Sequence, residues 1–214
     1  MSALAINEIF YSIQGESTRS GLPCVFVRLA GCNLRCVWCD TAYAFHEGTL
    51  MSLEAVLDAV RAFPCRRVEV TGGEPLLQSS VHGLLSTLCD RGYETLLETG
   101  GSFDIRTVDR RVRRIVDVKC PGSGMADRNF WDNLEDLRPS DEAKFVVRDR
   151  GDFDWALAII RRHELTARCP VLISGVFGEL PLAELARWVL DAGLDLRLQL
   201  QLHKFIWEPS LRGV

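Results

Sequence analysis

The sequence has no long hydrophobic run, no internal repeat and no low-complexity linker. No apolar stretch in its 214 residues approaches the roughly 20 residues that a membrane-spanning helix needs. Without repeats or linkers, we expect residues 1–214 to form a single domain, which is long enough to bury a substantial core. The sequence also lacks a signal peptide, so we expect its eight cysteines to be reduced and the protein to be cytoplasmic.

The chain also lacks a strong excess of positive charge. It has 25 Lys and Arg residues against 29 Asp and Glu residues, for a net charge of −4. Its one basic cluster, residues 106–114, is interrupted by Asp109, Val108 and Val112 and is typical of a solvated face. This balance argues against a general nucleic-acid partner, and the missing apolar runs argue against a membrane partner.

Three of the eight cysteines are concentrated in one short stretch. Cys32, Cys36 and Cys39 are separated by three and by two residues. Thiolates this close together can converge on one soft metal centre. Four would complete a zinc site, whereas three can anchor a four-iron cluster and leave one iron open to a small molecule.

Two other interpretations of these cysteines exist. A zinc site would need a fourth ligand, for which Cys24 and His46 are the candidates. A disulfide with one spare thiol is the other, but the chain is longer than disulfide-stapled mini-domains and has no secretory signal. A zinc-stabilised binding module therefore remains the alternative from a different functional class.

The secondary structure pattern is mostly strand–helix–strand, which predicts a parallel sheet with helices outside it. Glycine-rich or polar clusters follow the carboxyl ends of the strands, where α/β barrels gather their chemistry. The linker between the third and fourth strands has little helical pattern. We therefore expect an α/β fold, a partial, open (β/α) barrel of six to seven mainly parallel strands with fewer outer helices. The strand candidates are residues 24–29, 67–71, 94–99, 114–119, 143–147, 170–174 and 196–202.

Two further features predict a binding pocket. Arg28 lies in an otherwise apolar strand, where a charge is costly unless it is paired. It forms either a buried ion pair or a bidentate clamp on a substrate carboxylate, and its position four residues before Cys32 favours the clamp. Thr71-Gly72-Gly73-Glu74 ends a strand with paired glycines, which let the backbone approach a ligand closely.

These motifs together resemble one known family. The Cys32–Cys39 spacing and the Gly-Gly-Glu segment resemble the cluster loop and the Gly-Gly-Glu segment of the radical S-adenosylmethionine (SAM) superfamily. Within it, the sequence is similar to 7-carboxy-7-deazaguanine synthases over nearly its whole length. The motifs that carry this second resemblance are Phe10–Glu16, Cys32–Thr41, Thr71–Pro75, Glu98–Gly100 and Gln201–Lys204.

The resemblance implies an activity and cofactors. The family converts 6-carboxy-5,6,7,8-tetrahydropterin to 7-carboxy-7-deazaguanine with loss of ammonia, in the pathway to queuosine and other 7-deazapurines. It uses one [4Fe–4S] cluster, SAM and Mg²⁺, takes electrons from a donor such as a flavodoxin, and forms homodimers. The nearest alternative is a radical SAM activase of a glycyl-radical enzyme.

The resemblance also implies roles for individual residues. The cluster ligands would be Cys32, Cys36 and Cys39, and the magnesium ligand would be Thr41. SAM would contact Trp38, Cys39, Asp40, Gly73, Glu74, Lys119 and Cys120. The pterin would contact Ile13, Gln14, Gly15, Glu16, Arg28, Thr71 and His203. The chain departs from the family pattern in Glu98-Thr99-Gly100-Gly101, which lacks the Asn common after Glu-Thr in relatives, and in residues Ser210 to Val214, which follow Pro209.

Overall fold

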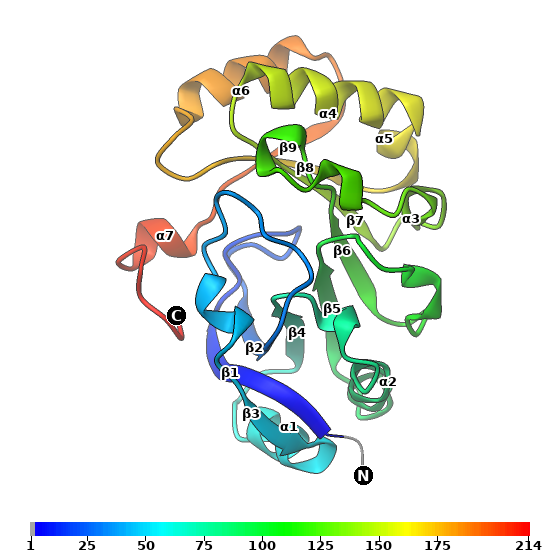
Figure 1. The fold of residues 1–214 in the computed structure, drawn as a ribbon, viewed down its shortest axis with the longest axis vertical. Helices are drawn as coiled ribbons and strands as arrows, with labels where there is room; N and C mark the ends of the chain where they lie inside the picture. Colours follow the sequence, from blue (N-terminus) through cyan, green and yellow to red (C-terminus); the bar gives the residue numbers. More distant parts are fainter. Residues whose placement is uncertain (1–2) are drawn as a thin grey trace.

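The computed structural model describes residues 3–214 and contains one curved, open sheet of nine strands (Figure 1). The strand order is β3-β1-β2-β4-β5-β6-β7-β8-β9, and the seven strands from β2 to β9 along this order pair in parallel. This confirms the predicted partial, open barrel. The strands are β1 (Ala3–Ile13), β2 (Pro23–Leu29), β3 (Thr49–Ser52), β4 (Arg67–Gly72), β5 (Glu94–Thr99), β6 (Arg113–Asp117), β7 (Glu142–Val147), β8 (Val171–Gly175) and β9 (Leu196–Gln199).

The seven parallel strands correspond to the seven predicted segments. Two antiparallel strands, β1 and β3, extend the sheet at one edge and were not counted in the prediction. Strand β1 has eleven residues and pairs with both β2 and β3. Strand β3 has only four residues, so its sequence is too short to show the two-residue period by which strands are recognised.

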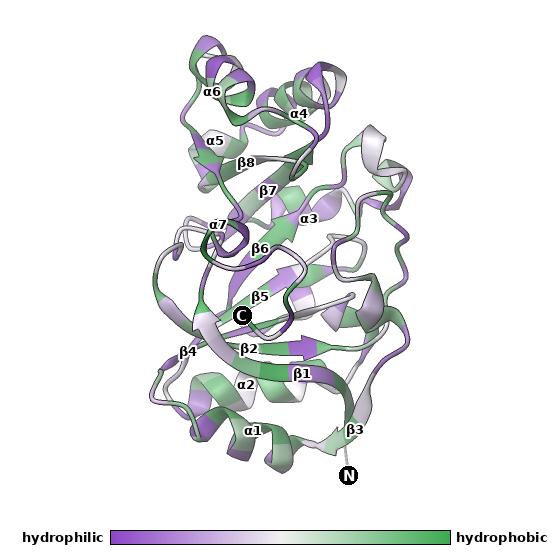
Figure 2. Ribbon diagram, turned by 90° about the vertical axis from the view of Figure 1, so that its left-hand side faces the viewer, coloured by the Kyte–Doolittle hydropathy of each residue, from purple (hydrophilic) through white to green (hydrophobic). Residues whose placement is uncertain are grey.

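The helices cover the outer face of the sheet at its two ends, as Figure 2 shows for α1 and α2 at one end and α4 and α6 at the other. Ser52 caps the start of helix α1, and its hydroxyl accepts a hydrogen bond from Ala55 N at 3.2 Å. Between β5 and β6 the chain forms only a 3-10 turn, Ile105–Thr107, as the missing helical pattern predicted. The helices are α1 (Leu53–Arg61), α2 (Val81–Asp90), α3 (Asp132–Glu135), α4 (Arg150–Arg162), α5 (Leu165–Arg168), α6 (Leu182–Asp191) and α7 (His203–Ile206).

The two faces of the sheet have different chemistry, because side chains alternate along each strand. On the outer face, residues such as Val68 and Val70 pack with the helices and are fully buried. On the inner face, the neighbouring positions Glu69 and Thr71 are polar and line a cavity. The outer face therefore supplies the hydrophobic core, and the inner face supplies the site. No helix within residues 3–214 is long and apolar enough to cross a membrane.

Candidate active site

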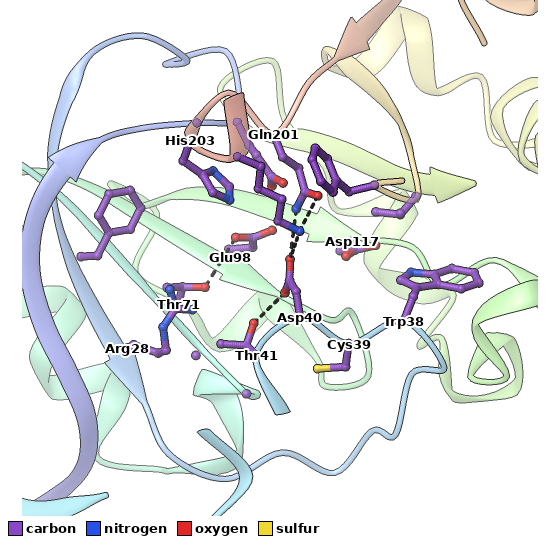
Figure 3. Close-up of a pocket in the computed structure, with 18 of the residues that line it drawn as sticks. Arg28, Trp38, Cys39, Asp40, Thr41, Thr71, Glu98, Asp117, Gln201 and His203 are labelled. Carbon is purple, nitrogen blue, oxygen red and sulfur yellow. Dashed lines mark hydrogen bonds and ion pairs between the residues drawn. The ribbon is translucent and has the colours of Figure 1, made fainter. Parts of the chain in front are cut away.

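The inner face encloses a cavity of about 690 Å³. Its walls come from the carboxyl ends of the parallel strands, from the loop of residues 30–41, here called the cysteine loop, and from the C-terminal segment, residues 200–214. Figure 3 shows side chains from these parts of the chain pointing toward one another. Because the carboxyl ends of parallel strands meet at one edge of the sheet, residues far apart in sequence converge here.

The cysteine loop is fixed by direct backbone contacts with the turn after β4. Gly73 N donates to Leu29 O at 3.2 Å, and Glu74 N donates to Gly31 O at 2.9 Å. A Cβ atom on Gly73 would lie 2.1 Å from Gly31 O and 2.7 Å from Cys32 Cβ. Only glycine fits at this position, so the paired glycines bring the backbone of one loop against the other.

The three cysteines of this loop all line the cavity, and none is in a disulfide. Partial burial raises the pKa of each thiol, while the nearby Lys119 ammonium opposes that rise. In residues 3–214, no three His, Cys, Asp or Glu side chains converge as the ligands of a single metal ion would. A four-iron cluster needs no such convergence, because each cysteine binds a different iron, so the donor set fits a cluster better than it fits zinc.

The two candidate fourth ligands for zinc do not reach this cavity. Cys24 is fully buried within β2, and His46 is exposed after the 3-10 turn Ala42–Phe45. Neither lines the cavity that contains the three cysteines. The geometry thus gives no support to the zinc-stabilised module.

Most residues predicted to contact SAM also line the cavity, namely Trp38, Cys39, Asp40, Gly73 and Lys119. Two do not. Cys120 is buried behind the cavity wall, and the Glu74 carboxylate accepts hydrogen bonds from Thr99 Oγ1 at 2.9 Å and Gly100 N at 2.7 Å. Glu74 therefore connects the turn after β4 to the end of β5. Both of its carboxylate oxygens accept hydrogen bonds from within the protein.

All seven residues predicted to hold the substrate line the same cavity. Arg28 has a partner that the sequence did not suggest, because its Nε donates to Glu8 Oε1 at 2.7 Å. These residues are opposite each other in the antiparallel β1–β2 pair. Within residues 3–214 we find no hydrogen bond from the two terminal guanidinium nitrogens. The ion pair and a clamp on a ligand carboxylate are therefore compatible.

The C-terminal segment closes one side of the cavity through the Gln201–Lys204 motif. Leu202 N donates to Gly15 O at 2.9 Å, and the His203 ring lies so close that a Cβ on Gly15 would be 2.1 Å from its Nδ1. Lys204 Nζ donates to Asp40 Oδ2 at 2.7 Å. Desolvation raises the pKa of Asp40, but the Lys204 ammonium and the hydrogen bonds from Lys204, Thr41 and Gln201 together lower it well below its ordinary value.

Thr41 lies at the cavity wall beside Asp40, and its hydroxyl donates to Asp40 Oδ1 at 2.8 Å. This bond uses the hydroxyl hydrogen and leaves the oxygen lone pairs available to a hard cation. The donor set at this point, a hydroxyl beside a carboxylate, is chemically compatible with magnesium.

The sequence interpretation assigned no site role to four charged residues that the strands contribute to the cavity wall. They share a recognisable signal, since each stands at an inward position of an apolar strand, as Arg28 does. Lys144, for example, lies between Ala143 and Phe145, and its ammonium bonds to Glu16 and, at 2.7 Å, to Glu98 Oε1. The missed residues are Glu69, Glu98, Asp117 and Lys144.

Comparison with known proteins first identifies the superfamily. Residues 27–124 match the radical SAM superfamily. The crystal structure of QueE from Escherichia coli has the same fold, with a TM-score of 0.78 over 94% of this chain and 95% of that one, at 22% identity. Together with the full-length relatives described next, these matches make the protein a radical SAM enzyme, a class whose cofactors are a [4Fe–4S] cluster and SAM.

The sequence also matches named relatives over its full length. It is 49% identical to the 7-carboxy-7-deazaguanine synthase of Chlorobaculum tepidum, over 99% of this chain and 97% of that one. It is 42% identical to the 7-carboxy-7-deazaguanine synthase of Koribacter versatilis, over 99% of this chain and all of that one. The chain belongs to the 7-carboxy-7-deazaguanine synthase family, as the sequence motifs predicted.

Proposed function

We propose that this protein converts 6-carboxy-5,6,7,8-tetrahydropterin to 7-carboxy-7-deazaguanine and ammonia, in queuosine and 7-deazapurine biosynthesis. One observation carries the proposal. The three thiols of the cysteine loop and the polar residues of the Gln14–Glu16 and Gln201–Lys204 motifs line a single cavity. A cofactor on the loop and a polar heterocycle on the opposite wall would thus meet without any large movement of the chain.

Cys32, Cys36 and Cys39 would hold the cluster. Trp38, Asp40, Gly73 and Lys119 would contact SAM. When bound, the cluster and SAM supply a 5′-deoxyadenosyl radical that removes a hydrogen atom from the substrate. Glu74 and Cys120 would support the SAM site from behind the cavity wall rather than touch the ligand.

The substrate would lie against the opposite wall. The terminal nitrogens of Arg28 would grip its carboxylate, and the polar groups of Gln14, Glu16, Thr71 and His203 would hold its ring. Burial lowers the pKa of His203, so the imidazole is neutral at pH 7 and can both donate and accept a hydrogen bond. Holding the ring and the carboxylate at two separate points fixes the reacting carbon, where small displacements are costly in rate.

Magnesium would bind at Thr41, whose hydroxyl oxygen would be one hard ligand among water and substrate oxygens. The variant Thr41→Ala is expected to keep its cluster, to turn over more slowly and to respond less to added Mg²⁺. Iron content and turnover across a magnesium titration measure this. An unchanged magnesium response would remove Thr41 from the metal site.

We further propose that the protein acts as one domain and as a homodimer in the cytoplasm, with electrons supplied by a donor such as a flavodoxin. The eight free thiols are consistent with a reducing compartment. Light scattering on the cluster-loaded protein tests the dimer, and turnover with reduced flavodoxin in place of a chemical reductant tests the donor.

Anaerobic turnover tests the main proposal. Cluster-loaded protein is incubated with SAM, a reductant and 6-carboxy-5,6,7,8-tetrahydropterin, and the products are identified by mass analysis. We expect 7-carboxy-7-deazaguanine from the parent and none from Cys36→Ala. Cleavage of SAM without conversion of any pterin would reject the substrate while leaving the enzyme class intact.

A further inference from the structure

The substrate wall of the cavity contains three carboxyl groups around one ammonium. Lys144 Nζ bonds to Glu16 and Glu98, but not to Glu69. Glu69 is only 2% exposed, and its one hydrogen-bond partner in residues 3–214 is the Gln14 side-chain amide, which donates to its Oε2. A buried carboxylate without a cationic partner is costly, whereas a buried carboxylic acid is not.

We propose that Glu69 keeps its proton at neutral pH and is a specificity-determining residue, donating a hydrogen bond to an acceptor group of the substrate ring. This inference rests on the proposed pterin activity. Glu98, which is paired with Lys144, would act in the opposite sense and accept from ring N–H groups. The two carboxyl groups would thus recognise different groups of one ligand: Glu69 would bind an acceptor, and Glu98 would bind a donor.

Most of the surroundings of Glu69 favour its protonated form. Desolvation and the charges of Glu98 and Glu16 raise its pKa well above the ordinary value, and Lys144 offsets this only in part. For Glu98, desolvation also raises the pKa, but the adjacent Lys144 outweighs it and lowers the pKa. The titratable groups that face Glu69 are Glu16 from the β1–β2 loop, Cys24 from β2, Glu98 from β5, and Glu142 and Lys144 from β7.

The hydrogen bonds of Gln14 determine which oxygen of Glu69 is available to a ligand. Glu16 N donates to Gln14 Oε1 at 2.9 Å, so the Gln14 NH₂ group is the one that faces Glu69. A neutral Glu69 accepts this N–H at its carbonyl oxygen, Oε2, which places the acid hydroxyl on Oε1. Glu69 lines the cavity, and among residues 3–214 we find no partner for Oε1.

The chemistry of the substrate class explains why such a donor is useful. A pyrimidinone ring has N–H donors and a carbonyl acceptor, and ionised carboxylates can only accept. If every carboxyl group of the wall were ionised, the partly negative carbonyl oxygen of the ring would face negative charges. One protonated carboxyl group changes an acceptor into a donor at a single point, without adding a cation to the wall.

The test compares Glu69→Gln with Glu69→Leu and Glu98→Gln. Glutamine is uncharged, and it can accept from Gln14 through its carbonyl while its NH₂ group replaces the acid hydroxyl. We expect Glu69→Gln to bind the pterin within about threefold of the parent, and the other two variants to lose about tenfold or more. Circular dichroism and iron content show that each variant is folded and loaded with its cluster.

Two binding results would overturn the proposal. If Glu69→Gln binds as weakly as Glu69→Leu, the site needs an ionised carboxylate. If Glu69→Leu binds as tightly as the parent, Glu69 does not contact the ligand.

An infrared measurement separates this proposal from the proposed function. A neutral carboxylic acid has a C=O stretching band that a carboxylate lacks, so the parent-minus-Glu69→Gln difference spectrum at pH 7 should contain it without substrate or cluster. If that band is absent, the proton assignment is wrong even when the parent makes the expected product. If the band is present but the parent binds no pterin, the donor role falls with the proposed function.

Discussion

Replacing Lys144 by methionine tests whether the buried ion pairs of Lys144 with Glu16 and Glu98 stabilise the fold. The Lys144 side chain is 7% exposed, and its partners Glu16 and Glu98 are 13% and 23% exposed. Removing one partner of a buried pair costs about 3–5 kcal/mol, because it leaves uncompensated buried charge. Since both partners retain some solvent contact, we expect a loss near the lower end, about 3 kcal/mol. For a domain of this length that lowers the unfolding temperature by roughly 6–12 °C.

The stability difference between the parent and Lys144→Met should change with pH in a definite direction. In the parent, the pKa of Glu98 is lowered overall, so its contribution to stability is present above the unfolded pKa and is lost as pH falls through the folded pKa. Burial already raises the pKa of Glu16 in the parent; without Lys144, desolvation and mutual repulsion raise it further and also raise the pKa of Glu98. Their neutral forms then favour folding at low pH, and stability is lost as pH rises. The difference between parent and variant should therefore be larger at about pH 8 than at about pH 5.

The assay is thermal and denaturant unfolding of the cluster-free protein at both pH values. Arg61→Met is the matched control, because it removes an exposed pair with Asp58 whose side chains are 69% and 51% exposed. That variant should change stability by less than about 1 kcal/mol at either pH. If Lys144→Met unfolds like the control, or if its deficit does not grow with pH, the buried pairs do not stabilise the fold as argued.

The remaining predictions concern the cofactor and substrate parts of the cavity. Cys36→Ala should assemble no cluster, whereas Cys89→Ala should keep full iron content because it lies away from the cavity; equal iron loss in both would refute the assignment. Arg28→Lys should keep its cluster and bind the pterin roughly tenfold or more weakly, since an ammonium cannot replace the charge-assisted bonds of a planar guanidinium. Unchanged affinity with a lowered unfolding temperature would make the role of Arg28 purely structural. Gly15→Ala should cost about 1–3 kcal/mol of stability and weaken substrate binding, because the new Cβ displaces the His203 ring; wild-type binding would show that this ring is not part of the site.

The sequence alone predicts the parallel part of the fold well, because each buried strand is an apolar run and each turn after it contains glycine or a polar cluster. It fails at β3, whose pairing with β1 depends on tertiary contacts and not on its four residues. Within the site, the contiguous Cys32–Cys39 spacing was decisive. The pairing of Glu8 with Arg28 was not visible, because it depends on the register of two antiparallel strands.

The missed acids show a second limit of sequence reasoning. Glu69 and Glu98 were recognisable as charges within apolar strands, but a single sequence does not say which of two carboxyl groups faces a lysine from a third strand. That depends on the alignment of β4, β5 and β7 across the sheet. Only the structure shows that Glu98 has the cation and Glu69 does not.

The backbone contacts that hold the cysteine loop also bear on how the protein acquires and loses its cluster. Gly31 N donates to Ala44 O at 2.8 Å, Val37 N donates to Ser123 O at 3.1 Å, and Arg35 lies 4.3 Å over the Phe45 ring. None of these contacts involves a metal ligand, so none of them depends on bound iron. A zinc finger, by contrast, unfolds without its metal. Oxidative loss of the cluster should therefore leave an intact scaffold, and restoring iron and sulfide should repair the damaged enzyme without a refolding step.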